Sequence, residues 1–119
     1  MRSIETGLTT VGISSLATGT VLIWKNGKLI PCETSFDEMV MGVVETGRDE
    51  PIVFGAEPVL VTGIVNEGDY IVTSDKQGHG MGVPRGSVHP NDLFAKVIAQ
   101  AVDSGNGESY TIKAMIRKM

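Results

Sequence analysis

Apolar residues along this chain occur in short runs separated by glycine-rich and polar turns, a spacing that predicts strands rather than helices. Two of these runs, at 21–24 and 28–32, flank Lys25-Asn26-Gly27. An Asn-Gly pair between two apolar runs predicts a tight hairpin, because both central residues of a type I′ turn need positive φ. At 110–116, apolar and polar residues alternate as in a half-buried strand. Further strands are predicted at 39–45, 52–54, 59–65, 70–74, 80–83 and 93–102.

Glycine and proline predict where these strands end. Residues 55–58 (Gly-Ala-Glu-Pro) are expected to break the chain between two strands, and residues 103–108 are expected to form a flexible turn. Three such residues, Pro84, Gly86 and Pro90, predict a loop without regular structure over 84–92. The alanine-rich spacing of 93–102 would also suit a helix, but its place in the pattern favours a strand. No segment of the sequence clearly predicts a helix.

The pattern of strands and turns occurs twice. The first unit begins at Gly19 and ends at Val65, and the second begins at Gly68 and ends at Ile116. Each unit consists of a glycine, a strand, a turn, a second strand, a strand with small residues and a closing strand. We therefore predict an all-β fold, a small β-barrel or sandwich built from two similar β units, with 19–119 as a single β domain.

Residues 1–18 precede the repeat and are rich in threonine, serine and glycine. They contain more apolar residues than a tail surrounded by solvent would, so we expect an extended N-terminal arm that packs on a neighbouring subunit. A first strand with a loose end is an equally good interpretation. The candidate interaction residues of this arm are Ile4, Leu8, Val11, Ile13 and Leu16.

Trp24 lies at the end of a predicted strand, directly before the Asn-Gly turn. A tryptophan at a hairpin tip can be an exposed anchor for a partner, so Trp24 is a further candidate interaction residue. The same side chain could instead cover the end of the hydrophobic core. The loop at 84–92 is the other segment that the repeat leaves uncovered, and it is a second candidate for a functional surface.

Composition limits the classes of protein that fit. A chain of 119 residues with 41% apolar residues suits one domain with a hydrophobic core, and 15 glycines suit many tight turns. The net charge of −4 argues against a nucleic-acid partner, which usually needs a basic face. No apolar run has the length of a transmembrane helix and no signal peptide is evident, so no membrane partner is expected. The only cysteine is Cys32, which excludes an intrachain disulfide and predicts a buried thiol in a reducing cytoplasm.

Several polar residues have the side chains that catalysis or metal binding needs. The set Ser74, Asp75 and His79 lies within one turn-rich stretch, whereas a catalytic triad needs side chains from separate rigid elements, so we predict a hairpin turn there. Zinc-ligand types occur at Cys32, His79 and His89, but their spacing matches no zinc motif. We therefore expect no catalytic residues, no metal site and no cofactor, and predict that the chain is not an enzyme; a hydrolase that uses Ser74 or His79 is the less favoured alternative.

Five motifs follow one another at 19–31, 41–44, 59–65, 68–78 and 95–116. Their most specific part is Gly68-Asp69 followed by Thr73-Ser74-Asp75 and Gly78. In this order the motifs resemble a structural β-domain of bacteriophage virions, found in capsid decoration (cement) proteins and in tail-fibre or spike domains. The resemblance covers about residues 19–117.

The resemblance implies a non-enzymatic virion structural protein, assembled in the host cytoplasm as a homotrimer that contacts the major capsid protein or other virion proteins. Fibre domains usually end a much longer chain, whereas this sequence starts at Met1 and has 119 residues. We therefore expect a capsid decoration protein that stabilises the head through subunit contacts. The alternative is a tail-fibre, spike or collar component for host attachment, which would bind host surface glycans through loops such as 46–51 and 84–92.

Overall fold

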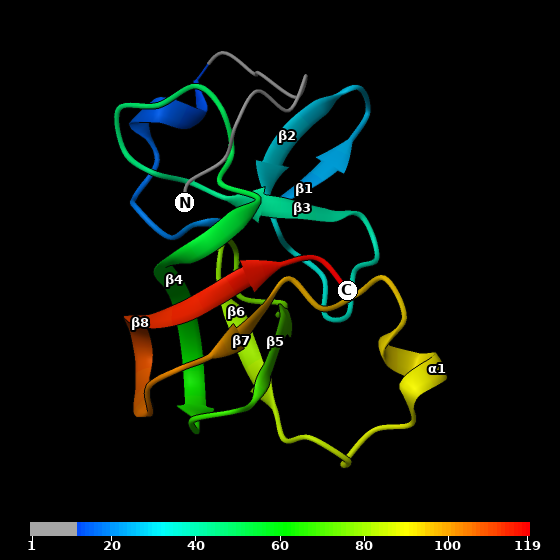
Figure 1. Cartoon of the computed structure of the whole chain (residues 1–119). Helices are drawn as coiled ribbons and strands as arrows, with labels where there is room; N and C mark the ends of the chain where they lie inside the picture. Colours follow the sequence, from blue (N-terminus) through cyan, green and yellow to red (C-terminus); the bar gives the residue numbers. More distant parts are fainter. Residues whose placement is uncertain (1–11) are drawn as a thin grey trace.

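A computed structural model describes residues 12–119 (Figure 1). Three of the predicted arm residues, Ile4, Leu8 and Val11, lie outside the described residues. The described chain folds into a three-stranded sheet and a closed barrel of five strands. The predicted all-β fold is therefore confirmed, in its barrel form. Within the described residues, no helix has the length and apolar character that crossing a bilayer requires.

The first half of the chain forms the three-stranded sheet at the top of Figure 1, in the order β2-β1-β3. Its strands are β1 (Val21–Lys25), β2 (Lys28–Pro31) and β3 (Val40–Val43). Between β1 and β2, Asn26 and Gly27 have φ values of 53° and 77°. The predicted hairpin with positive φ at both central residues is therefore confirmed.

The barrel has the strand order β4-β6-β5-β7-β8 and lies below the sheet in Figure 1. Its strands are β4 (Phe54–Val65), β5 (Tyr70–Thr73), β6 (Gly80–Val83), β7 (Ala99–Ala101) and β8 (Gly105–Arg117). The long strands β4 and β8 pair antiparallel, from Phe54 opposite Arg117 to Val65 opposite Gly105. The closing strands of the two sequence units therefore pair with each other and join the halves of the chain.

The two units share one topology, as the doubled sequence pattern predicts. In both units the first strand lies between the second and the third, as β2-β1-β3 and as β6-β5-β7. In the first unit, Gly19 N–H donates to Val44 O at 2.7 Å, and Val44 N–H donates to Thr20 O at 2.9 Å. Gly68, Ala101 and Asp69 repeat this pair of bonds in the second unit, both at 2.9 Å. The repeat in the amino-acid sequence is therefore also a repeat in the three-dimensional structure.

The chain break predicted at 55–58 is wrong, because β4 runs through this segment. The turn predicted at 103–108 is shorter than expected, because β8 already begins at Gly105. Proline usually ends a strand because it cannot donate to the ladder. Pro58 is opposite Lys113 of β8, and the pairing of β4 with β6 comes later, at Val61. Pro58 therefore occupies an edge position, where the missing N–H breaks no ladder bond.

The loop predicted for 84–92 is wrong at its end, where Pro90–Leu93 form the one-turn helix α1. Proline is tolerated in a first helical turn, because the N–H that it lacks has no partner within the helix there. His89 caps the turn, since its Nδ1 accepts a hydrogen bond from Asn91 N–H at 3.1 Å. The strand predicted for 93–102 is likewise shorter than expected and consists of β7 alone.

The core consists of one large cluster and two smaller ones. The large cluster includes Val61, Ile71 and Ile116 of the barrel and Val21 of the sheet, all fully buried. The alternation predicted for the last strand is confirmed, because Ile112, Ala114 and Ile116 are buried and their neighbours are exposed. A second cluster belongs to the three-stranded sheet, and a third lies beneath α1.

Candidate functional site

The predicted arm residues that the structure describes, Ile13 and Leu16, contact the second core cluster of their own chain. Ile13 lies in the 3-10 helix η1 (Ile13–Ser15) and is 2% exposed. It packs with Leu22, Leu29 and Val44, and Leu16 is half-buried against the same cluster. Residues 13–16 therefore belong to the folded unit.

Trp24 is half-buried and packs against this same cluster. Of the two interpretations that the sequence left open, its position fits the one in which the indole covers the end of the core. Trp24 also holds the hairpin to its neighbour, because its backbone N–H donates to Met39 O at 3.0 Å.

Ser74 and His79 are close to each other but do not form a nucleophile–base pair. The Ser74 hydroxyl donates to the backbone carbonyl of His79 at 2.6 Å, not to its ring. The ring lies with Nδ1 2.8 Å from Gln77 O and Nε2 2.7 Å from Ser109 Oγ. With a carbonyl facing Nδ1, that nitrogen donates and Nε2 accepts from the Ser109 hydroxyl. Asp75 is exposed. The predicted turn is therefore what these residues form.

Cys32 is fully buried and contributes to the same turn. Its thiol donates to the carbonyl oxygen of His79 at 3.3 Å. Burial raises the pKa of the Cys32 thiol above its ordinary value of 9.0. The two ring nitrogens of His79 are hydrogen-bonded to Gln77 and Ser109, and His89 lies at the start of α1. No group of metal-ligand side chains occurs within residues 12–119.

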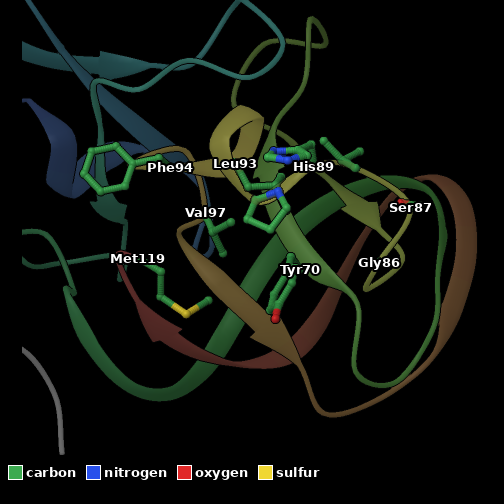
Figure 2. Close-up of a pocket in the computed structure, with 10 residues that line it drawn as sticks. Tyr70, Gly86, Ser87, His89, Leu93, Phe94, Val97 and Met119 are labelled. Carbon is green, nitrogen blue, oxygen red and sulfur yellow. The ribbon is translucent and has the colours of Figure 1, made fainter.

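An apolar pocket of about 610 Å³ lies where α1, β5 and the last residue of the chain meet (Figure 2). This volume is within the range of small-molecule pockets. The loop at 86–89 forms one wall, and no Asp, Glu, Lys or Arg side chain among residues 12–119 lines the pocket. Its apolar lining consists of Tyr70, Val88, Pro90, Leu93, Phe94, Val97 and Met119.

Two polar side chains of this pocket, Ser87 and His89, make local hydrogen bonds. Ser87 Oγ donates to Pro84 O at 2.6 Å. Because His89 Nδ1 accepts the capping bond from Asn91, the proton of a neutral His89 ring is on Nε2. These bonds shape the loop at 86–89, and the pocket presents mainly carbon to an incoming group.

Phe94 is the most exposed large apolar side chain in the described part of the chain, at 78%. It lies in a tight turn of residues 93–96, hereafter the Phe94 turn, closed by a 2.9 Å bond from Lys96 N–H to Leu93 O. Phe94 has φ −53° and ψ 127°, and Ala95 has φ 63°. These are the angles of a type II turn, in which the residue with positive φ is usually glycine. Figure 2 shows the Phe94 ring projecting away from the other labelled side chains.

Sequence reasoning missed Phe94 as a functional candidate. A usable signal was present, since Leu93 and Phe94 are adjacent large apolar residues and neighbours in a strand point to opposite faces. One of the two therefore had to face outward in the strand predicted for 93–102. The pocket itself could not be foreseen, because β5, the loop at 86–89, α1 and Met119 are brought together only by the fold.

Compared with known proteins, the chain matches no family model, no curated protein and no solved structure.

Proposed function

We propose that this protein is a non-enzymatic structural component of a bacteriophage virion, a capsid decoration protein that acts as a homotrimer and stabilises the head through contacts with the major capsid protein. The observation that carries the proposal is the duplicated β unit, with the orders β2-β1-β3 and β6-β5-β7 joined by the β4–β8 pair. The duplicated unit accounts for nearly the whole described chain as structural framework. The engagement of Ser74, His79 and Cys32 in one hairpin turn supports assembly, rather than chemistry, as their role.

The N-terminal arm supplies part of the contact surface in this proposal. Buried Ile13 fixes η1 to the three-stranded sheet, and residues 1–11 are joined to that fixed point. The proposal assigns the contact with a virion partner to the apolar residues of this segment, Ile4, Leu8 and Val11. Many copies of a modest apolar contact would stabilise a shell without any reaction.

The test is deletion of residues 2–11, followed by binding to virion heads that lack the protein. A deletion to residue 16 would also remove Ile13 from the second core cluster, and a loss of binding would then report unfolding. We expect the shorter deletion to keep the thermal unfolding transition and to lose most of the binding. A control that replaces Thr6, Thr9 and Thr10 with alanine leaves the apolar residues in place and should bind normally.

The copy number of the protein in purified virions tests the location. A number close to that of the major capsid protein supports a decoration protein, and a much lower number would favour the tail or collar. Absence of the protein from purified virions, together with no binding of the full chain to heads, would overturn the proposal.

A further inference from the structure

The Phe94 turn and the apolar pocket lie beside each other, because Phe94 and Leu93 both line the pocket that α1 borders. An aromatic side chain that is 78% exposed leaves a large apolar area in contact with water. The open pocket of about 610 Å³ next to it adds further apolar surface in contact with water. We propose that this face is a self-association surface, in which Phe94 of each of two copies inserts into the pocket of the other.

The geometry of the face suits a two-fold contact. In such a contact the same patch serves both copies, so it must carry both the inserting group and the site that receives it. The Phe94 ring projects from the rim, while Tyr70, Val97 and Met119 line the interior (Figure 2). An aromatic group in a dehydrated apolar pocket is the usual centre of a strong protein interface.

The charges around Phe94 also complement themselves. Asp92 precedes Phe94 by two residues and Lys96 follows it by two. If the two-fold axis is perpendicular to the Phe94 turns, the two segments run in opposite directions, and position 92 of one copy lies opposite position 96 of the other. Neither side chain makes an ion pair within residues 12–119. The absence of charged side chains of residues 12–119 from the pocket lining and the opposite charges on either side of Phe94 together fit a second copy.

The backbone conformation supports a functional reason for the exposed ring. A left-handed alanine is strained, and such residues persist where the surrounding structure holds them in place for a use. The φ of 63° at Ala95 closes the Phe94 turn and keeps the ring outside the third core cluster, while Leu93 and Val97 on either side remain buried. The turn thus presents Phe94 alone to a partner.

The first test is the mass of the full chain in solution by sedimentation over a range of concentrations. The wild-type protein is expected to associate in pairs, and Phe94→Ala should weaken this step about tenfold or more and halve the mass. The matched control is Ile64→Ala, because Ile64 is also a well-exposed apolar side chain, at 64%, and it does not line the pocket. Met119→Glu, which puts a charge on the pocket wall outside any strand, should act like Phe94→Ala.

The second test is charge reversal, which separates the contact from general loss of apolar surface. Asp92→Lys and Lys96→Asp each place like charges opposite each other and should weaken pairing, whereas the double variant should restore it. Pairing that is unchanged by Phe94→Ala, or a double variant weaker than both single ones, would overturn the inference. So would a wild-type chain that stays unpaired at all concentrations.

This contact is independent of the virion role proposed above. It has two-fold symmetry, so it is separate from the interface of a trimer and would join two trimers where both exist. Sedimentation of the purified chain needs no virion partner, and deletion of residues 2–11 should leave pairing intact. A loss of pairing caused by that deletion instead would make the arm, and not Phe94, the group that inserts into the pocket.

Discussion

Gly19 and Gly68 are equivalent residues of the two β units, with φ values of 91° and 92°. Each amide donates to a carbonyl at the end of the third strand of its unit, Val44 or Ala101. Their surroundings differ, however. A Cβ on Gly19 would lie 2.7 Å from the backbone nitrogen of Leu60, whereas one on Gly68 would meet only the flexible Arg85 side chain, at 3.2 Å.

This difference predicts unequal costs for the same substitution. Gly68→Ala should lower the free energy of unfolding by about 1 kcal/mol, because alanine is strained at this φ. Gly19→Ala should cost about 3 kcal/mol or more, because the backbone of β4 must also move. Urea unfolding of both variants measures the costs. Gly47→Ala, at φ 92° with no atom within 4 Å of its Cβ, is the control for strain alone. Equal values for all three would contradict the close approach of Gly19 to β4.

The hydroxyl of Ser74 predicts a stability effect and no catalytic one. Ser74→Ala removes a buried 2.6 Å bond to His79 O and should lower the free energy of unfolding by about 1–2 kcal/mol. Ser87→Ala removes a bond of the same length to Pro84 O, but at an exposed site, where water replaces the hydroxyl. Thermal unfolding should therefore separate the two variants clearly. Matching transition temperatures would mean that the Ser74 bond is not a significant part of the turn.

The buried thiol of Cys32 predicts a loss of stability at alkaline pH. Its pKa in the folded chain is raised above 9.0 by burial, so the folded state keeps a proton that the unfolded state releases. The stabilising contribution is complete below about pH 9 and falls as pH rises toward the folded pKa, by at most about 1.4 kcal/mol per pH unit. Free energies of unfolding measured between about pH 8 and pH 10 should show this decline.

Cys32→Ser provides the control for that decline, since its hydroxyl keeps a donor facing His79 O and does not ionise in this range. The variant should lose most of the pH dependence just above pH 9. Tyr110 also has a pKa raised by desolvation above its ordinary 10.0, so it adds a second decline at higher pH. A variant with the same slope as the wild type below about pH 10 would exclude Cys32 as the source.

Ala95 predicts that one glycine substitution stabilises the protein. At φ 63°, alanine is strained by about 1 kcal/mol or more, and glycine removes that strain at a smaller entropic cost. Ala95→Gly should therefore raise the free energy of unfolding by about 0.5 kcal/mol. Ala56→Gly, in the exposed part of β4, should lower it by about 1 kcal/mol. Destabilisation of similar size in both variants would show that the Phe94 turn does not have the left-handed geometry.

Local turn chemistry explains the parts of the fold that the sequence predicted. Asn26-Gly27 encodes its hairpin through two residues that tolerate positive φ, and the alternation at 110–116 encodes the face of β8 that is buried. The equivalence of Gly19 and Gly68 is visible because a left-handed residue at a strand entry calls for glycine in both units.

Contacts between segments that are distant in sequence explain why the other predictions from the sequence were wrong or incomplete. Pro58 is compatible with β4 because β6 pairs with β4 further along, at Val61. The local sequence around Pro58 contains no sign of this pairing. Pro90 was interpreted as a breaker, although the same residue suits the start of α1 once His89 is in place to cap it. The pocket depends on Tyr70 and Met119, which are far apart in sequence, so its residues share no local signal.

The pairing of β4 with β8 also constrains when this protein can fold. As the chain is synthesised, residues 54–65 leave the ribosome well before their partner, Gly105–Arg117. Until then one side of β4 has no ladder neighbour, and an unpaired strand edge readily pairs with other chains. The pairing that closes the barrel is therefore complete only after residue 117 has been made. Slow translation between β4 and β8 is then expected to prolong the period in which nascent chains aggregate.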